Sequence, residues 1–156
     1  MNNQEKKINL LDLPDIIIIK IVNYITNSDL ESIKLGRKFS NNLKQGTIVG
    51  LNGEIGSGKT TFIKGILEGL NYKHDVTSPT FTLINEYDAD LKVIHIDFYR
   101  EENIERWKNM GFEEILYNND VILIEWSNLI PDLLPKDILI LNFKHIKENK
   151  RKIYLK

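Results

Sequence analysis

Residues 53–60, Gly-Glu-Ile-Gly-Ser-Gly-Lys-Thr, constrain the fold more than any other stretch, because they complete the pattern G-x-x-x-x-G-K-[ST]. A β-branched, apolar run at 47–51 precedes this loop, and apolar residues at helical spacing follow it from 60 to 70. The loop therefore lies between a strand and a helix, which is the context in which the pattern binds phosphate. The alternative, a glycine-rich turn that binds nothing, is disfavoured by this context.

Each part of the loop has a chemical task. Glycines 53, 56 and 58 allow successive backbone N–H groups to turn inward around phosphate oxygens. Lys59 adds a full positive charge near the β- and γ-phosphates, and the Thr60 hydroxyl is a ligand for Mg²⁺. We therefore expect a bound nucleotide. The predicted nucleotide-binding residues of the loop are Gly53, Glu54, Ile55, Gly56, Ser57, Gly58, Lys59, Thr60 and Thr61.

Composition excludes several other classes of protein. A chain of 156 residues without cysteine has neither a disulfide framework nor a cysteine-ligated zinc site. Its net charge of −1 gives no general attraction to nucleic acid. The longest early apolar run, 16–22, is too short to span a bilayer and is interrupted by Lys20. We expect a cytoplasmic protein with no membrane partner.

The order of the remaining patterns predicts an α/β fold of the P-loop NTPase type. It has three layers, with a central mixed, mainly parallel sheet flanked by helices. Residues 28–156 form the P-loop domain, and residues 1–27 form an extension whose isoleucine run, 16–19, predicts a strand joining the same domain.

Within the domain, Ser28 and Glu31 have the spacing of a capping box, so a helix is expected from Ser28 until Gly46 stops it. Gly65 and Gly69, in the helix after the loop, suggest close packing or, for Gly69, the end of the helix. The other predicted elements are a hairpin of strands at 82–87 and 92–98, short helices near 101–107 and 113–117, a buried strand at 121–125, and final strands at 137–143 and 152–155.

Two apolar runs, 93–96 and 121–124, each end in a carboxylate, at Asp97 and at Glu125. The carboxyl ends of strands in a parallel sheet face the ligand crevice. Both acids are therefore expected beside Lys59 and Thr60, where they would support Mg²⁺ and γ-phosphate chemistry. For either acid taken alone, the alternative is a solvated residue at a strand end.

Some residues have a structural interpretation that is preferred to a functional one. His95 shares a strand face with Asp97, but a hydrogen-bonded core histidine is favoured because phosphoryl transfer depends mostly on positioning. For Arg100, a surface ion pair with Glu101 or Glu102 is favoured over stabilisation of a transition state. A basic cluster near the C-terminus is expected to be solvated, with an RNA or acidic partner as the alternative. It consists of Lys144, Lys147, Lys150, Arg151 and Lys152.

Four further motifs accompany the loop: Ser78-Pro79-Thr80-Phe81, His95-Ile96-Asp97-Phe98-Tyr99-Arg100, Ile124-Glu125-Trp126-Ser127 and Leu134-Pro135. In order and spacing, the set resembles the bacterial TsaE (YjeE) family, and the resemblance covers about residues 28–143. It implies a Mg²⁺-dependent P-loop ATPase, which converts ATP to ADP and phosphate. It also implies partnership with the TsaB and TsaD proteins in making threonylcarbamoyladenosine (t6A) in tRNA, with tRNA met only through the complex.

The resemblance also implies roles for particular residues. Lys59, Asp97 and Glu125 would be catalytic, and Thr60, Asp97 and Glu125 would support the metal, with the division of labour between the two acids left open. Thr80 would face the γ-phosphate. Trp126 would contact the nucleotide, although a tryptophan at such a position is more often a core or interface residue. Because a loop at the γ-phosphate can report nucleotide state, we expect residues 77–81 in the partner interface.

Three other functions are compatible with a phosphate loop. A small-molecule kinase is disfavoured because there is no arginine-rich lid segment among the chain's few arginines, which are Arg37, Arg100, Arg106 and Arg151. A GTPase is disfavoured because the Asn-Lys-x-Asp and Asp-x-x-Gly motifs are missing. A nucleotide-sensing adaptor would keep the fold and lose only turnover.

Overall fold

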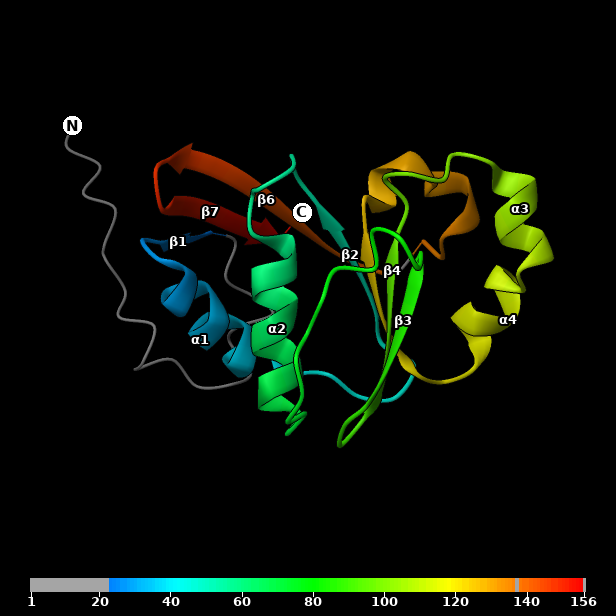
Figure 1. Cartoon of the computed structure of the whole chain (residues 1–156), viewed down its shortest axis with the longest axis horizontal. Helices are drawn as coiled ribbons and strands as arrows, with labels where there is room; N and C mark the ends of the chain where they lie inside the picture. The colour runs from blue at the N-terminus through cyan, green and yellow to red at the C-terminus, as the bar shows by residue number, and fades with distance from the viewer. Residues whose placement is uncertain (1–22, 137, 156) are drawn as a thin grey trace.

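The computed structural model describes residues 23–136 and 138–155. In this part of the chain one mixed sheet has the strand order β1-β7-β6-β2-β5-β4-β3 (Figure 1). The strands are β1 (Tyr24–Thr26), β2 (Ile48–Asn52), β3 (Ile84–Asp88), β4 (Lys92–Asp97), β5 (Val121–Glu125), β6 (Leu139–Lys147) and β7 (Lys150–Leu155). The helices are α1 (Asp29–Ser40), α2 (Lys59–Gly69), α3 (Ile104–Asn109) and α4 (Phe112–Tyr117), with short 3-10 helices η3 (Ser127–Leu129) and η4 (Pro131–Leu133). No helix within the described ranges has the length and apolar character needed to cross a membrane.

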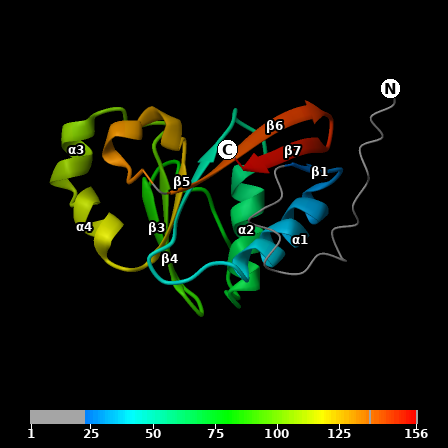
Figure 2. The same ribbon diagram turned by 180° about the vertical axis from the view of Figure 1, so that it is seen from behind.

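Different helices cover the two faces of the sheet, as Figures 1 and 2 show from opposite sides. Phe39 of α1 and Phe62 of α2 belong to the same buried cluster as Leu123 of β5. On the other face, Trp107 of α3 shares a second cluster with Ile122 of β5. Neighbouring residues of one strand thus enter opposite cores, as the two-residue period of a strand requires. The predicted fold is confirmed: three layers with a mixed, mainly parallel sheet.

The beginning of α1 follows from its sequence, but its end does not. The Ser28 hydroxyl accepts a hydrogen bond from the Glu31 backbone N–H at 3.1 Å, as the capping pattern predicts. The helix ends at Ser40, so the predicted end at Gly46 is wrong. Between Ser40 and Gly46 the backbone hydrogen bonds join residues three apart, as in a turn; for example, the Leu43 N–H donates to the Ser40 carbonyl at 3.0 Å. Gly46, with a φ of 76°, instead shapes the connection to β2.

Helices α1 and α2 approach closely where their residues are small. A Cβ atom on Gly65 would lie 2.2 Å from the Ile33 carbonyl oxygen, and one on Gly69 would lie 2.2 Å from the Ser40 hydroxyl oxygen. The close packing expected at both glycines is therefore confirmed. It fixes α2, and with it the phosphate loop, against the rest of the fold.

The predicted strands agree with the structure apart from their ends. The expected hairpin is the antiparallel pair β3 and β4, and the last two strands pair as β6 and β7. Strand β6 runs on to Lys147 because its end pairs with the start of β7, a long-range contact that the sequence does not show. The strand predicted at 16–19 lies outside the described residues. Within the 1–27 extension, β1 pairs with β7 at the edge of the sheet.

The topology brings three strand ends to one place. The phosphate loop leaves β2, which pairs in parallel with β5 on one side and β6 on the other. Across β2 and β5, Leu51 is opposite Glu125, and across β5 and β4, Glu125 is opposite Asp97. The two carboxylates therefore lie side by side next to the phosphate loop.

Candidate nucleotide-binding site

A cavity of about 500 Å³ opens at the ends of β2, β4 and β5. This volume falls within the range of small-molecule sites. Most predicted site residues line the cavity, namely Ile55, Gly56, Gly58, Lys59, Thr60, Thr61, Thr80, Asp97, Glu125 and Trp126. The structure thus brings together residues from four separate segments of the chain.

Two glycines give the phosphate loop a shape that other residues resist. Gly56 has a φ of 76°, and Gly58, the residue before α2, has a φ of 99°. Both angles lie in the left-handed region, which costs a residue with a side chain roughly 1–2 kcal/mol. A Cβ atom on Gly58 would also lie 2.7 Å from Cδ of Arg151. The backbone can curl toward the cavity here because no side chain is present.

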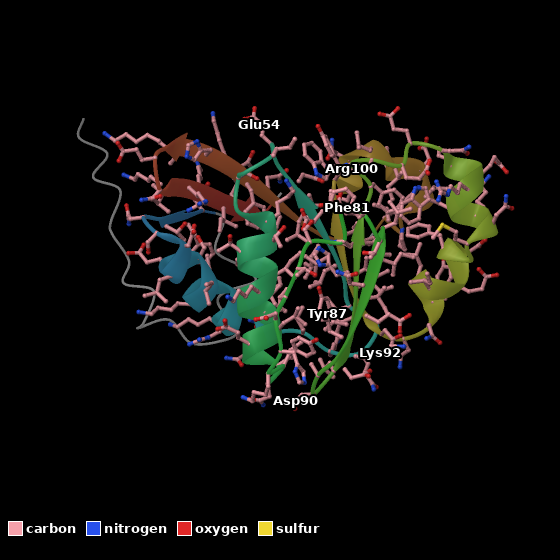
Figure 3. The ribbon with its side chains drawn as sticks, viewed as in Figure 1. Glu54, Phe81, Tyr87, Asp90, Lys92 and Arg100 are labelled. Carbon is pink, nitrogen blue, oxygen red and sulfur yellow. The ribbon has the colours of Figure 1, made fainter. Side chains whose placement is uncertain are left out.

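Three predicted loop residues do not line the cavity. Gly53 and Glu54 contribute their carbonyl groups to Lys59, while the Glu54 side chain is exposed at the edge of the molecule (Figure 3). Ser57 is buried, and its hydroxyl oxygen has no hydrogen-bond partner among the described residues. These residues shape the loop from within and do not form its cavity-facing surface.

The Lys59 ammonium group is held at the loop by backbone oxygens. Nζ donates to the Gly53 carbonyl at 2.6 Å and to the Glu54 carbonyl at 3.1 Å, and it lies 4.4 Å from the centroid of the Trp126 ring. Burial lowers the pKa of Lys59, and the nearby charges of Glu125 and Asp97 oppose that effect. A phosphate group would give this cation a stronger acceptor than the two carbonyls.

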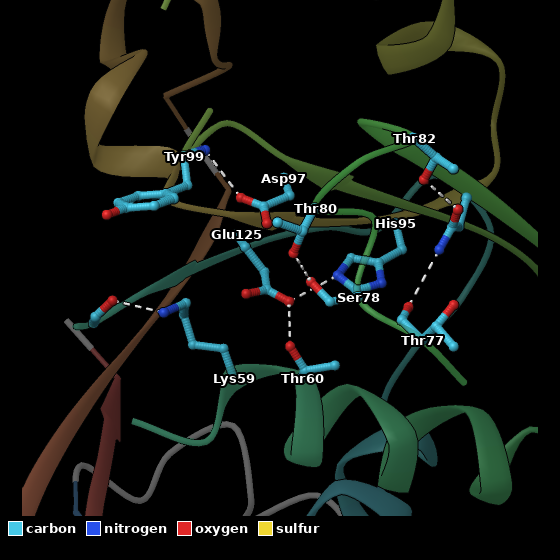
Figure 4. A network of polar contacts seen from close by, with 12 residues as sticks. Lys59, Thr60, Thr77, Ser78, Thr80, Thr82, His95, Asp97, Tyr99 and Glu125 are labelled. Atoms are coloured by element: carbon cyan, nitrogen blue, oxygen red, sulfur yellow. Dashed lines mark hydrogen bonds and ion pairs between the residues drawn. The ribbon is translucent and has the colours of Figure 1, made fainter. Parts of the chain in front are cut away.

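Glu125 connects the phosphate loop to the sheet. Its Oε1 atom accepts a hydrogen bond from the Thr60 hydroxyl at 2.9 Å and lies 2.9 Å from His95 Nε2 (Figure 4). Burial alone would raise the pKa of Glu125, but the bonds from His95 and Thr60 and the charge of Lys59 outweigh it and lower the pKa. Glu125 therefore remains ionised.

Asp97 lies in a different electrostatic environment from Glu125. Burial raises its pKa, although the bond from the Tyr99 backbone N–H to its Oδ1 atom, at 2.9 Å, opposes the shift. The negative charge of Glu125 raises the pKa further. Environments that separate the pKa values of two adjacent carboxyl groups are typical of sites where the groups have different tasks.

His95 is a buried, hydrogen-bonded residue, as the sequence analysis favoured, but its partner is the site carboxylate itself. It is 0% exposed, and its ring stacks on that of Tyr87 with centroids 6.4 Å apart. The Tyr87 hydroxyl donates to the Thr77 carbonyl at 2.9 Å. One series of contacts therefore leads from Thr60 through Glu125 and His95 to the loop at 77–82.

The 77–82 loop forms one wall of the cavity. The hydroxyls of Ser78 and Thr80 are 2.7 Å apart, and both residues line the cavity. Phe81 is 85% exposed, and Cζ of Arg100 lies 4.7 Å from the centroid of its ring (Figure 3). The surface ion pair expected for Arg100 with Glu101 or Glu102 is wrong: Glu101 pairs with Arg106, and Arg100 instead lines the cavity.

The basic cluster is divided between two strands, β6 with Lys144 and Lys147 and β7 with Arg151. Lys144 and Lys147 are exposed as expected, whereas Arg151 is 9% exposed and lines the cavity. It lies on the same face of β7 as Ile153, which belongs to the core beneath α1 and α2. The two-residue spacing between Arg151 and Ile153 in the sequence could have predicted that Arg151 faces inward. Tyr99, whose ring packs on that of Trp126 at 4.8 Å, also lines the cavity without having been predicted.

The comparisons with known proteins agree with these observations. A family model described as "Threonylcarbamoyl adenosine biosynthesis protein TsaE" matches residues 26–153. The chain belongs to the TsaE family. This TsaE-family chain is 40% identical over 111 residues to the Bacillus subtilis (strain 168) protein named "tRNA threonylcarbamoyladenosine biosynthesis protein TsaE", covering 70% of this chain and 69% of the relative. The protein of that name from Rickettsia typhi is 39% identical over 127 residues, covering 80% and 88% of the two chains.

A solved structure shows the same likeness in three dimensions. The crystal structure of Bacillus subtilis YdiB superposes with a TM-score of 0.74 and 32% sequence identity, covering 86% of this TsaE-family chain and 83% of YdiB. The family expected from the motifs and the P-loop fold are both confirmed.

Proposed function

We propose that this chain is a Mg²⁺-dependent ATPase that supports t6A modification of tRNA together with TsaD and TsaB. The observation that carries the proposal is the 2.9 Å hydrogen bond between Thr60 and Glu125. It joins the hydroxyl of a phosphate loop to a strand-end carboxylate inside one cavity, which is the arrangement that metal-dependent phosphoryl transfer needs. Membership of the TsaE family supports the biological process.

The loop residues fit the phosphate groups of ATP. The curled backbone at Gly56 and Gly58 and the first turn of α2 present N–H groups to an anion, and α2 adds the positive end of its dipole. Lys59 then exchanges its two backbone acceptors for phosphate oxygens. The recognition of adenine is inferred from the family alone.

The residues at the end of the loop also fit Mg²⁺. The described residues contain no group of three or more His, Cys, Asp or Glu side chains suited to hold a metal. Mg²⁺ at nucleotide sites is usually bound through one or two carboxylates, with substrate phosphates and water completing its octahedron. Thr60, Glu125 and Asp97 supply such oxygens. When bound, Mg²⁺ neutralises charge that develops on the β- and γ-phosphates.

The two acids differ in ways that assign them tasks. Glu125 has a lowered pKa and bonds Thr60 directly, so it supports the metal as a permanent anion. Asp97 lines the same cavity beside Glu125, and we assign it the attacking water, which it would orient and whose proton it would accept. The water oxygen bonds to the γ-phosphorus as the bond to the β-γ bridging oxygen breaks, which yields ADP and phosphate.

The partners TsaD and TsaB are inferred from the family. We place their contact at residues 77–81, because Phe81 is 85% exposed beside Arg100, which lines the cavity. The loop is linked through Tyr87 and His95 to Glu125, so its position can report what the cavity holds. Thr80→Val should weaken the nucleotide dependence of partner affinity, and an unchanged dependence would count against this contact.

The central experiment measures ATP hydrolysis by the chain alone and with TsaB and TsaD, for the wild type and for Lys59→Ala, Asp97→Ala and Glu125→Ala. Each variant should lose at least about tenfold in turnover, since each removes a charge placed at the reacting phosphate. Lys64→Ala is the matched control, because it removes an exposed lysine from the same helix.

Three outcomes would contradict the proposal. Unchanged turnover in all three site variants would reject the mechanism. Phosphorylation of a small acceptor, with neither partner recovered in a pull-down, would favour a kinase. Tight ATP binding without hydrolysis, even in the assembled complex, would favour an adaptor.

A further inference from the structure

Arg151 is one of the cations that line the cavity, with Lys59 and Arg100, and the proposed ATPase chemistry gives it no task. Its side chain is 11% exposed and forms an ion pair with Asp29 Oδ1 at 2.7 Å. Its Nη1 atom donates to the Asn149 carbonyl at 3.2 Å. Its Nε atom is buried without a hydrogen-bond partner among the described residues.

This arrangement is a poor one for stability alone. Burying a guanidinium costs free energy that one ion pair does not fully recover, and a buried N–H without an acceptor adds to that cost. The carboxylate partner, Asp29, is 65% exposed, so solvent screens the pair. An apolar side chain would pack against Gly58 and the core at this position at lower cost. The charge therefore indicates a ligand.

The topology indicates which part of the ligand Arg151 faces. Glu125 and Asp97 lie on β5 and β4, on one side of the loop-bearing strand β2, whereas Arg151 lies on β7, beyond β6 on the other side. The bond from Thr60 to Glu125 marks the side where Mg²⁺ and the γ-phosphate bind. The opposite side therefore receives the α-phosphate and the nucleoside. Arg151 packs there against Gly58 and lines the cavity together with Thr61.

We propose that Arg151 binds the α-phosphate of the nucleotide. The site would then contact the ligand next to its nucleoside as well as at its terminal phosphates. This inference rests on the proposed nucleotide site. A planar guanidinium suits it, because its fork of N–H groups matches two phosphate oxygens. Asp29 holds the guanidinium at the cavity wall before the ligand binds. Since Arg151 lies away from the γ-phosphate, it contributes to binding and not to the chemical step.

The test is calorimetric titration of the full chain with ADP. Arg151→Gln should weaken ADP binding by about 10- to 100-fold, the effect of losing one or two charge-assisted hydrogen bonds. Arg151→Met retains the packing of the side-chain stem on Gly58 and should weaken binding equally. Arg151→Lys should restore part of the affinity. Lys152→Gln, which removes a charge from the opposite face of the same strand, should change it by less than about twofold.

Hydrolysis kinetics separate this role from others. In Arg151→Gln and Arg151→Met the KM for ATP should rise while kcat at saturating ATP stays within about twofold, because a contact made equally in the ground and transition states affects only binding. ADP affinity that is unchanged in both variants overturns the proposal. So does a fall of kcat together with affinity, which would mean that Arg151 only supports the loop. A wild-type chain that binds ADP without hydrolysing ATP would refute the proposed function and leave the Arg151 test intact.

Discussion

His95→Leu is the substitution that most directly tests how the site is held together. His95 is completely buried, and its Nε2 atom lies 2.9 Å from Glu125 Oε1. Leucine has a similar volume and keeps the apolar contact with Tyr87, but it cannot donate a hydrogen bond. The change therefore removes one bond to a buried carboxylate without opening a large cavity.

The size of the effect follows from the kind of bond that is lost. A hydrogen bond to a charged group contributes about 1.5–3 kcal/mol, and the Thr60 bond to the same oxygen remains. Because leucine offsets part of this loss by its greater hydrophobicity, we expect the free energy of unfolding to fall by about 1–2 kcal/mol. If the bond also orients Glu125 in the transition state, kcat should fall by about 10- to 100-fold.

The assay combines urea unfolding with ATP turnover and with an NMR titration of the Glu125 carboxyl group. In His95→Leu the pKa of Glu125 should rise, because His95 is the strongest influence that lowers it. His95→Gln places an amide nitrogen near the position of Nε2 and should recover much of the turnover. Thr26→Val is the stability control, since Thr26 lies on β1 at the far edge of the sheet and the change removes its buried hydrogen bond to Ser32 of α1.

Two results would refute this reasoning. Turnover of His95→Leu equal to that of the wild type would show that the bond does not orient Glu125. If His95→Leu loses no more turnover than Thr26→Val at equal destabilisation of the fold, then only stability has changed.

Three further predictions concern the fold and its charges. Glu125 has a lowered pKa in the folded state, so its contribution to stability is present above its ordinary value of 4.5 and is lost as the pH falls through the folded value. Asp97 has a raised pKa, so its contribution is lost as the pH rises from 3.8 through the folded value. Unfolding curves of Glu125→Gln and Asp97→Asn, each compared with the wild type from pH 3 to pH 7, should therefore differ in opposite directions, and parallel differences would contradict the assignment. Gly65→Ala should destabilise the fold by about 1–3 kcal/mol, because its Cβ would meet the Ile33 carbonyl oxygen at 2.2 Å; an unchanged melting temperature would contradict this. Ser28→Ala should cost about 1 kcal/mol through loss of the helix cap, measured by thermal unfolding, and Ser28→Asp should restore it.

Much of the site was predictable because its components are local patterns. The phosphate loop specifies its own backbone through Gly56 and Gly58, and the apolar runs before Asp97 and Glu125 identify strands that end in acids. If the sheet is assumed to be parallel, the ends of these strands meet at one edge, and the two acids are predicted to lie beside Lys59. The prediction for Arg100 was wrong because it considered only the acidic residues next to it in sequence. In the structure Arg100 lies over Phe81, which is distant in sequence.

The sequence by itself determined the phosphate loop, the helix that follows it and the two strand-end carboxylates, because each depends on residues that are adjacent in the chain. Only the tertiary structure decided that His95 holds Glu125, 30 residues away, and that Thr60 bonds the same carboxylate across 65 residues. It also decided that Arg151, which belongs to a basic cluster in the sequence, lines the cavity at the strand ends. Such contacts depend on which strands become neighbours and on which face of a strand each side chain lies. The packing of the whole sheet against α1 and α2 sets both.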